Sequence, residues 1–290
     1  MFNDKKILVT GGAGFVGSHL CEALSQDKNN DVYSLDNYFT GSKENHVNGV
    51  TYIKGSTHNI EDLVTFRPDI VYHLGEYSRV EQSFDDIKKV YEFNKIGTFS
   101  VLEFVRKSGC KIIYAGSSTK YGDEGHNANA SPYAWSKSSN TQLVKNYGEW
   151  FGIDYVITYF YNVYGPREIQ TGKYATLIAL FKEKMKNGEK LTVVTPGEQK
   201  RNFTHIDDTV DALLLIGEKG QGDEYGIGSH HGYTVLEVAK MFGGGIEMLP
   251  ERKGNRMVAT VVCDKTKALG WESKRKLENC IEEYRKNGWR

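Results

Sequence analysis

A glycine-rich turn between an apolar strand and an amphipathic helix constrains this chain more than any other feature. The segment Thr10-Gly11-Gly12-Ala13-Gly14-Phe15-Val16-Gly17 follows the apolar run at residues 5–10 and opens a helical pattern. A tight turn needs backbone conformations that glycine adopts at little cost. Bare backbone also lets a pyrophosphate reach the unpaired N–H groups at a helix N-terminus. The alternative is a structural turn without a ligand. The residues expected to hold the phosphates are Gly11, Gly14, Phe15, Val16 and Gly17.

An acidic residue at the end of the next strand indicates which nucleotide the turn binds. Asp36 closes the run at residues 31–36, about 20 residues after the glycines, as in dinucleotide-binding folds. Its carboxylate would accept hydrogen bonds from the adenosine ribose hydroxyls and would repel a 2′-phosphate. The expected cofactor is therefore NAD rather than NADP.

Strands and helices alternate through the first two thirds of the chain. Runs rich in Val, Ile and Tyr predict strands at residues 5–10, 31–36, 50–53, 70–74, 111–115 and 155–159. Helical patterns separate most of them, at residues 60–66, 90–107 and 133–151. This alternation favours an α/β fold with a doubly wound parallel sheet of the Rossmann type, covered by helices on both faces.

The pattern changes after Gly165-Pro166. We predict an NAD-binding domain at residues 1–165 and a smaller α+β lobe, mainly for substrate, at residues 166–290. Part of the segment 191–216 is expected to return to the main domain. The expected elements of this part are helices at 174–187, 207–216, 234–241 and 277–286, and a strand at 191–194.

Composition excludes several other classes of protein. Lys+Arg and Asp+Glu both number 37, which does not suggest the clustered basic surface of a nucleic-acid binder. No apolar run approaches the roughly 20 residues that span a bilayer, and the N-terminus lacks the apolar core of a signal peptide. The cysteines are far apart, which fits reduced thiols in a cytoplasmic protein and gives no metal signature. We expect Cys21 and Cys110 to be buried.

A tyrosine and a lysine four residues apart indicate hydride-transfer chemistry. Tyr133 and Lys137 would share one face of a helix. A free tyrosine has a pKa near 10, and an adjacent ammonium together with a cationic nicotinamide would favour the phenolate. The spacing alone is common in ordinary helices. However, the strand at 111–115 is followed by Gly116-Ser117-Ser118-Thr119, and ligands bind at the carboxyl ends of strands in this fold.

These motifs together resemble the extended short-chain dehydrogenase/reductases, and within them the UDP-glucose 4-epimerase-like nucleotide-sugar epimerases and dehydratases. The resemblance runs nearly from end to end. Its further motifs are Leu35-Asp36-Asn37, His73-Leu74, Asn94 with Gly97-Thr98, Tyr121-Gly122, Tyr161-Asn162-Val163-Tyr164-Gly165-Pro166-Arg167, Arg201-Asn202-Phe203-Thr204-His205-Ile206-Asp207-Asp208 and Leu269-Gly270-Trp271.

The resemblance implies a role for each matching residue. Ser117 matches the catalytic hydroxyl, Tyr133 the base, and Lys137 its activating partner, which also binds the nicotinamide ribose. Asn162 and Arg201 match residues that hold the substrate diphosphate. The further residues expected to contact NAD are Asp36, Asn37, Ser56, Thr57, Leu74 and Asn94, together with Tyr133 and Lys137.

Two other positions have simpler alternatives. Arg252 looks like a second arginine for the diphosphate, since a guanidinium pairs well with phosphate oxygens; a solvated surface position is the alternative. His73 is expected to pack or to cap its strand rather than to take part in chemistry.

The chain departs from the family pattern at several positions. An acid near the adenine is replaced by Gly55-Ser56-Thr57, where Ser56 can still bond the adenine amino group. After the fourth strand, where small residues are usual, the chain has Glu76 and Arg79. These two are expected beside the substrate, reading an unusual sugar, or alternatively paired with each other at the surface.

Two further departures bear on the reaction. The segment Gly122 to Pro132 is short for the family, which should open the sugar pocket to a larger or modified sugar, with Trp135 offsetting part of that space. The 4,6-dehydratases carry an Asp-Glu pair after the catalytic hydroxyl, because elimination of water needs an acid and a base. Ser118 and Thr119 stand there instead and are expected to contact substrate, so dehydration is disfavoured.

The resulting hypothesis is a nucleotide-sugar 4-epimerase. Tyr133 would take a proton from the sugar C4 hydroxyl while hydride passes to NAD⁺, and hydride would then return to the opposite face. The runner-up is a 4-dehydrogenase that releases the keto-sugar, with GDP and a heptose or another envelope sugar as an alternative to UDP. A catalytically silent NAD-binding protein is a distant alternative. The expected partners are the UDP- or GDP-linked sugar and a second copy of the chain, joined through helices 94–107 and 133–151 as in the family; neither nucleic acid nor a membrane is expected.

Overall fold

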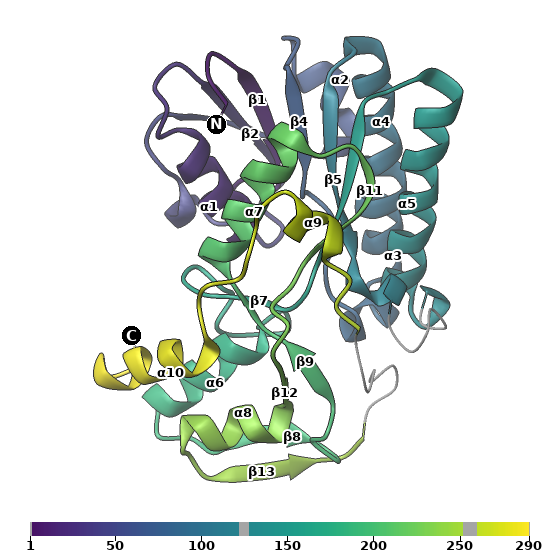
Figure 1. The fold of residues 1–290 in the computed structure, drawn as a ribbon. Helices are drawn as coiled ribbons and strands as arrows, with labels where there is room; N and C mark the ends of the chain where they lie inside the picture. The colour runs from purple at the N-terminus through teal and green to yellow at the C-terminus, as the bar shows by residue number, and fades with distance from the viewer. Residues whose placement is uncertain (1, 122–127, 252–259, 290) are drawn as a thin grey trace.

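The computed structural model describes residues 2–121, 128–251 and 260–289. Seven strands form a parallel sheet in the order β11-β6-β5-β4-β1-β2-β3 (Figure 1). The strands are β1 (Lys6–Thr10), β2 (Asp31–Asp36), β3 (Val50–Lys54), β4 (Ile70–His73), β5 (Lys111–Ser117), β6 (Tyr155–Phe160) and β11 (Gly222–Ile227). The predicted doubly wound α/β fold is confirmed.

The strand order reverses beside β1. The chain runs outward from β1 through β2 to β3, and then returns to place β4 on the other side of β1. Thr10 pairs with Leu35 of β2 and with His73 of β4. The crevice outside the carboxyl ends of the strands at such a switch point is where this fold binds ligands.

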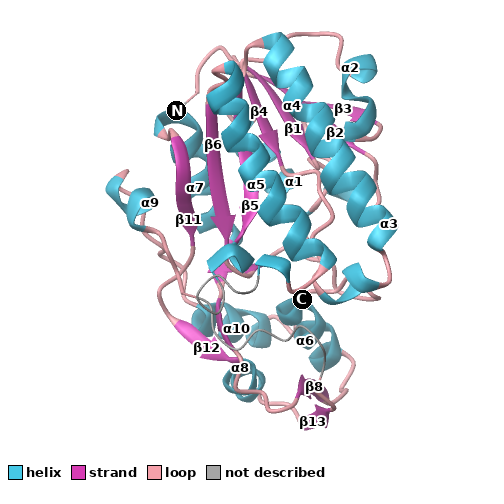
Figure 2. Ribbon diagram, turned by 90° about the vertical axis from the view of Figure 1, so that its right-hand side faces the viewer, coloured by secondary structure: helices cyan, strands magenta, loops and turns pink. Residues whose placement is uncertain are grey.

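Helices cover both faces of the sheet (Figure 2). They are α1 (Phe15–Leu24) and α7 (Ile206–Lys219) on one face, and α2 (Ile60–Leu63), α4 (Gly97–Ser108) and α5 (Pro132–Phe151) on the other. Ile7 and Val9 pack under α1 and α7, whereas Leu8 between them packs on the opposite face. Because successive strand side chains point to opposite faces, burial on both faces explains the continuous apolar run of β1.

The predicted helix at 90–107 has a wide turn in it. It begins earlier, as α3 (Ile87–Val90), continues through the π-helical turn η4 (Tyr91–Ile96), and ends as α4. Such turns often occur at functional sites. Asn94 is buried in this turn, and its carbonyl accepts a hydrogen bond of 2.8 Å from the side chain of Asn140 on α5.

A smaller lobe lies below the sheet in Figure 1. Its strands pair as β7 (Val163–Tyr164) with β10 (Thr204–His205), β8 (Leu191–Val194) with β13 (Ile246–Leu249), and β9 (Lys200–Asn202) with β12 (Gly232–Thr234). Its helices are α6 (Leu177–Lys186), α8 (Val235–Phe242) and α10 (Leu277–Lys286). Their core includes Phe181 and Phe242, whose ring centroids lie 5.6 Å apart. The remaining short elements are η1 (Lys43–Asn45), η2 (Thr57–Asn59), η3 (Glu81–Phe84), η5 (Ser118–Tyr121) and α9 (Asp264–Ala268).

The segment that returns to the main domain extends further than the sequence indicated. Besides α7 it contains β11, which pairs with β6 at the edge of the sheet. This strand was not predicted, because it begins Gly222-Asp223-Glu224 and those residue types are rare in strands. Gly226 is required there: an added Cβ would lie 1.7 Å from the carbonyl oxygen of Val262.

The structure also bears on the cysteines, on membrane spans and on metal sites. Cys21 and Cys110 are buried, as predicted, and all four cysteines are free thiols. Within the described ranges, no helix has the length and apolar character to cross a membrane. Over the same residues, no three His, Cys, Asp or Glu side chains gather in a way that could hold a metal ion.

Asp208 joins two of the sequence motifs that are far apart in the chain. Its carboxylate accepts hydrogen bonds from Ser273 Oγ at 3.1 Å and from the backbone N–H groups of Lys274 at 3.0 Å and Arg275 at 2.9 Å. Its carbonyl accepts one of 2.8 Å from the indole of Trp271. The C-terminal segment is thereby fixed onto α7.

Asp208→Ala should therefore destabilise the fold. It would remove the hydrogen bonds that Ser273, Lys274 and Arg275 donate to this carboxylate, and a hydrogen bond to a charged group contributes about 1.5–3 kcal/mol to the unfolding free energy. Urea unfolding followed by circular dichroism measures this loss. Asp211→Ala, at an exposed position on the same helix, is the matched control and should change the midpoint little. Equal effects of the two variants would contradict the assignment.

Candidate active site

A cavity of about 660 Å³ opens at the carboxyl ends of the central strands. This volume lies in the usual range for a small-molecule site. The glycine turn lines one part of it and residues of the smaller lobe another. The predicted site residues that line it are Gly11, Gly14, Phe15, Val16, Gly17, Asp36, Asn37, Thr57, Leu74, Glu76, Arg79, Ser117, Ser118, Thr119, Tyr133, Lys137, Asn162 and Arg201. The fold thus gathers residues from most of the chain around one space.

Three predicted residues stand apart from this set. Ser56 does not line the cavity; its hydroxyl accepts a bond of 3.3 Å from the backbone N–H of His58 and caps η2. Asn94 lies behind the cavity wall, as described below. Arg252 lies outside the described residues.

The glycine turn has the bare backbone that a pyrophosphate needs. A Cβ on Gly17 would lie 2.1 Å from the carbonyl oxygen of Gly11, and one on Gly12 would lie 2.4 Å from Ser34 Oγ. Gly11 itself has a φ of 75°. These close approaches bring the N-terminus of α1 against the end of β1, leaving N–H groups that can bind phosphate oxygens.

Asp36 lies where the adenosine ribose is expected. One carboxylate oxygen accepts from the backbone N–H of Ala13 at 2.9 Å and the other from Tyr38 at 2.8 Å. Burial raises the pKa of Asp36, and these two backbone bonds partly offset that effect. Because a carboxylate has about four acceptor positions, it can still accept from ribose hydroxyls. The glycine turn and Asp36 therefore fit NAD.

Three hydroxyl groups converge in the middle of the cavity. The phenol of Tyr133 donates to Ser117 Oγ at 3.2 Å, and Thr119 Oγ1 donates to the same atom at 3.0 Å. Tyr133 lies in the first turn of α5, where the Ser131 hydroxyl accepts from the N–H of Ala134 at 3.0 Å. Such a cap, followed by Pro132, fixes the start of the helix. The start of α5 therefore fixes the position of the Tyr133 backbone, and with it the place from which the phenol enters the cavity.

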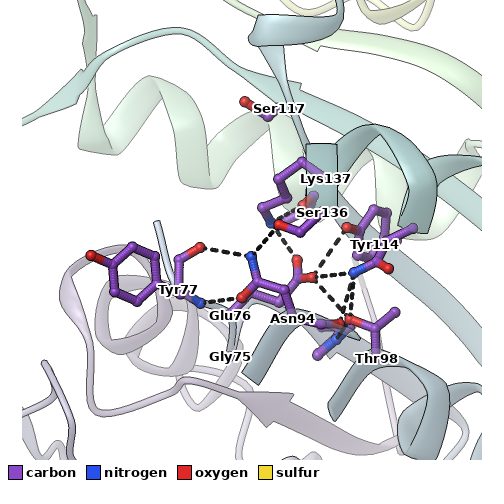
Figure 3. A network of polar contacts seen from close by, with 12 residues as sticks. Gly75, Glu76, Tyr77, Asn94, Thr98, Tyr114, Ser117, Ser136 and Lys137 are labelled. Carbon is purple, nitrogen blue, oxygen red and sulfur yellow. Dashed lines mark hydrogen bonds and ion pairs between the residues drawn. The ribbon is translucent and has the colours of Figure 1, made fainter. Parts of the chain in front are cut away.

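Lys137 lies one turn further along α5, beneath this group (Figure 3). Its ammonium donates to the carbonyl of Ala115 at 2.7 Å and forms an ion pair with the carboxylate of Glu76. Both side chains are almost inaccessible to solvent, at 6% exposed for Lys137 and 1% for Glu76. The sequence suggested that Glu76 contacts the sugar or pairs with Arg79. The carboxylate is instead engaged by Lys137, on the side away from Ser117 (Figure 3).

Asn94 explains why the Glu76 carboxylate faces Lys137. Its side-chain oxygen accepts from the backbone N–H of Tyr77 at 2.6 Å, and its amide donates to the carbonyl of Tyr77 at 3.1 Å. Both backbone groups after Glu76 are therefore fixed from the π-helical turn. His73, as expected, is a buried structural residue, bonded to Thr10 at 2.8 Å and to Thr98 at 3.0 Å.

Arg79 and Phe39 line another part of the cavity. Arg79 Nε donates to the carbonyl of Tyr174 at 2.9 Å. Phe39, whose ring centroid lies 5.2 Å from that of Tyr174, was not predicted from the sequence. Asp86, which is not among the cavity-lining residues, accepts from the phenol of Tyr174 at 2.7 Å. The hydrogen bond from Tyr174, followed by those from Lys173 and Tyr77, holds the pKa of Asp86 well below its usual range. Neither residue belongs to a recognisable motif.

The other end of the cavity carries the expected diphosphate-binding residues. Asn162 has a φ of 37°, and its amide donates to the carbonyl of Asn202 at 3.1 Å. Arg201 donates to the carbonyl of Lys200 at 2.8 Å. Both line the cavity, so its wall carries an amide from the loop between β6 and β7 and a guanidinium from β9.

Comparisons with known proteins agree with this geometry. Residues 7–228 match the model of the NAD dependent epimerase/dehydratase family. UDP-glucuronic acid decarboxylase 6 of Arabidopsis thaliana is 31% identical over 95% of this chain and 86% of its own. The UDP-glucose 4-epimerase of Thermotoga maritima, solved with UDP-glucose, has a TM-score of 0.89 and 30% identity, covering 97% and 99% of the two chains. The UDP-glucose 4-epimerase of Thermus thermophilus, solved with NAD, has a TM-score of 0.88 and 28% identity, covering 95% and 96%.

Gly17→Ala should weaken the binding of NAD at least tenfold, about 1.4 kcal/mol. The added Cβ would overlap the Gly11 carbonyl and push α1 away from the turn. Isothermal titration calorimetry measures the dissociation constant. Gly245→Ala in the smaller lobe, where a Cβ would meet only the side chain of Lys190 at 3.4 Å, is the control. Unchanged affinity in Gly17→Ala would exclude this turn as the phosphate site.

Proposed function

The chain belongs to the NAD-dependent epimerase/dehydratase family of enzymes, and we propose that it is a nucleotide-sugar 4-epimerase. The observation that carries this proposal is the hydrogen bond of 3.2 Å between Tyr133 and Ser117 in a cavity that also contains the glycine turn and Arg201. One space therefore has groups for the cofactor, for proton transfer and for a diphosphate.

The mechanism begins with proton transfer at the sugar C4 hydroxyl. The Tyr133 phenolate takes this proton, and Ser117 Oγ hydrogen-bonds the same substrate oxygen. NAD, when bound along the glycine turn, supplies the acceptor and later the donor of hydride. Lys137 supports the anionic phenol by its positive charge. Asn162 and Arg201 hold the diphosphate, so that the 4-keto sugar can turn over and present its other face while staying bound.

Ser118 and Thr119 favour epimerisation over loss of water. Elimination needs a general acid and a base beside the ring, and neither hydroxyl titrates near neutral pH. Thr119 is moreover engaged as a donor to Ser117. The nucleotide is uridine or guanosine diphosphate, and the sugar is hexose-like or a larger envelope sugar such as a heptose.

Arg79 favours a second candidate, decarboxylation of a sugar acid. Its guanidinium lines the cavity and lies close enough to Tyr133 and Glu168 for their charges to act on it. A guanidinium pairs well with a carboxylate. Oxidation of a uronic acid at C4 gives a β-keto acid, in which the C5–C6 bond breaks, carbon dioxide leaves, and C5 is protonated.

Mass spectrometry of products tests these activities. The protein and NAD⁺ would be incubated with UDP- and GDP-sugars labelled with deuterium at C4. A new peak of unchanged mass that retains deuterium supports the epimerase. A product lighter by one deuterium, lost from C4, and one hydrogen, lost from the C4 hydroxyl, indicates the 4-dehydrogenase. Loss of carbon dioxide indicates a decarboxylase, and loss of water would refute the argument from Ser118 and Thr119.

Tyr133→Phe should lower kcat about 10²–10⁴-fold, the usual contribution of a general acid–base. The binding of NAD should be retained, because the phenol is one of many contacts. Steady-state kinetics and calorimetry measure the two quantities. Tyr155→Phe, on a strand residue outside the cavity lining, is the control. Unimpaired turnover in Tyr133→Phe would exclude the mechanism, and biological function without turnover would favour the silent NAD-binding alternative.

We also propose a homodimer formed through α4, α5 and the preceding helical turns. Large apolar side chains are exposed along this face: Tyr91 is 54% exposed, Phe99 51% and Trp150 60%. Light scattering should give twice the chain mass. Trp150→Glu should shift the equilibrium toward monomer, whereas Met248→Glu, at an exposed apolar position in the smaller lobe, should not. A monomer at all concentrations would contradict this proposal.

The reaction belongs to cytoplasmic carbohydrate biosynthesis in this proposal. Four free thiols are typical of a reducing compartment. A nucleotide-diphosphate sugar is an activated donor, so the product would feed glycosyl transfer.

A further inference from the structure

The carboxylate of Glu76 receives hydrogen bonds from four different side chains. The ammonium of Lys137 contacts one oxygen. The other accepts from Thr98 Oγ1 at 2.9 Å, from the amide of Asn140 at 2.8 Å and from the phenol of Tyr114 at 3.2 Å (Figure 3). Burial raises the pKa of Glu76, but the charge of Lys137 and these hydrogen bonds together hold it below its ordinary value. The group is therefore a buried carboxylate anion.

This anion sets the direction of a chain of hydrogen bonds that reaches the glycine turn. The single proton of the Thr98 hydroxyl points to Glu76, so Thr98 accepts from Nε2–H of His73 at 3.0 Å. Nδ1 of His73 then accepts from the hydroxyl of Thr10 at 2.8 Å, and Thr10 accepts from the N–H of Gly75 at 3.0 Å. Burial lowers the pKa of His73 to about 4, so the ring is neutral.

The network therefore contains one anion in direct contact with the cation expected to activate Tyr133. Interactions between charges are strong in a site that excludes water. A carboxylate beside Lys137 cancels much of the ammonium's field at the phenol and at the nicotinamide. The negative charge also favours the cationic, oxidised nicotinamide over its neutral reduced form.

The other ionisable groups around Glu76 and Tyr133 do not supply the negative charge that Glu76 places beside the Lys137 ammonium. Tyr114 and the neutral His73 carry no charge. Lys95, on the π-helical turn, donates to Asn140 Oδ1 at 2.8 Å and lies beyond that amide. Arg79 lines the same cavity as Tyr133 and donates to the carbonyl of Tyr174. Glu168 lines the same cavity, where it accepts from the N–H of Gly165 at 2.9 Å and from the Thr176 hydroxyl at 2.6 Å, and burial raises its pKa to about 7. Removal of the Glu76 charge would leave Lys137 without its carboxylate partner.

We propose that Glu76 is a positioning residue that anchors Lys137. Its negative charge offsets the ammonium beside Tyr133 and thereby favours the binding of NAD⁺ over that of NADH. Bound NADH is then biased to return its hydride to the 4-keto sugar, which becomes an alcohol again as the cofactor is reoxidised. This inference rests on the proposed function, and it names the residue that would favour epimerisation over release of the ketone.

Glu76→Gln tests the inference because it removes the charge at nearly unchanged size; its amide oxygen can still accept, while its NH₂ group replaces one of the two acceptor oxygens. Calorimetry with NAD⁺ and with NADH gives the ratio of their dissociation constants. We expect the variant to bind NADH at least tenfold more tightly relative to NAD⁺ than the unaltered protein does, a change of about 30 mV for a two-electron couple. The pH midpoint of the Tyr133 phenolate, taken from the ultraviolet difference against the matching Tyr133→Phe variant, should fall by about one unit, a tenfold change in the ionisation equilibrium.

Matched variants separate charge from structure. Glu103→Gln removes a carboxylate that accepts from Tyr147 and Arg106 at the surface of α4, and should shift neither quantity. Tyr114→Phe removes one hydrogen bond to Glu76 but no charge, and should leave the ratio unchanged. Glu76→Asp retains the charge at a greater distance; it should shift the ratio in the same direction by less, and serves if the Gln variant does not fold.

The outcomes distinguish this inference from the proposed function. An unchanged ratio and midpoint in Glu76→Gln would overturn the role of Glu76, even if the enzyme epimerises a sugar. A shift as large in Tyr114→Phe would reduce Glu76 to a structural part of the network. Both expected shifts without turnover of any nucleotide sugar would support the role of Glu76 and count against the epimerase.

Discussion

The parallel pairing of β1 with β4 brings two bare main chains together, and the site is built outward from that junction. A Cβ on Gly11, just after β1, would lie 2.9 Å from the Cα of Gly75, just after β4, so a larger residue at position 11 would push the two main chains apart. Thr10 completes the junction by accepting from the N–H of Gly75 and bonding His73. The phosphate-binding turn begins on one side of this contact, and the residues that reach α5 begin on the other.

The junction leads to a buried ion pair between Glu76 and Lys137, which the spacing of Tyr133 and Lys137 alone does not predict. A buried ion pair is costly unless its remaining hydrogen-bonding positions are filled. Glu76 meets that condition with three neutral donors besides Lys137. The same bonds hold Lys137 between Ala115 and Glu76. Lys137 therefore lies between Tyr133, four residues earlier on α5, and a buried carboxylate.

The smaller lobe depends on contacts that bring the chain back to the main domain. Asp208 lies at the start of α7, and the segment that follows Trp271 is fastened to it. The cavity lining includes Asn162, from the loop between β6 and β7, and Arg201 of β9. Substrate selectivity is expected from this region, where Arg79, Phe39 and Tyr174 meet, because few groups there belong to the shared motifs.

The sequence by itself determined the doubly wound sheet, the glycine turn and many, but not all, of the residues that gather around the cavity. Those features depend on local patterns: apolar runs, glycines at a strand end, and a four-residue spacing on a helix. It did not reveal β11, whose residues favour a strand only beside β6 and beneath residues 260–263. It also left open the partner of Glu76. That choice depends on Asn94 fixing the backbone of Tyr77 and on Lys137, Thr98 and Asn140 arriving from other elements. The tertiary structure alone decided it, because a buried carboxylate must find its partners in space and the sequence records only their order.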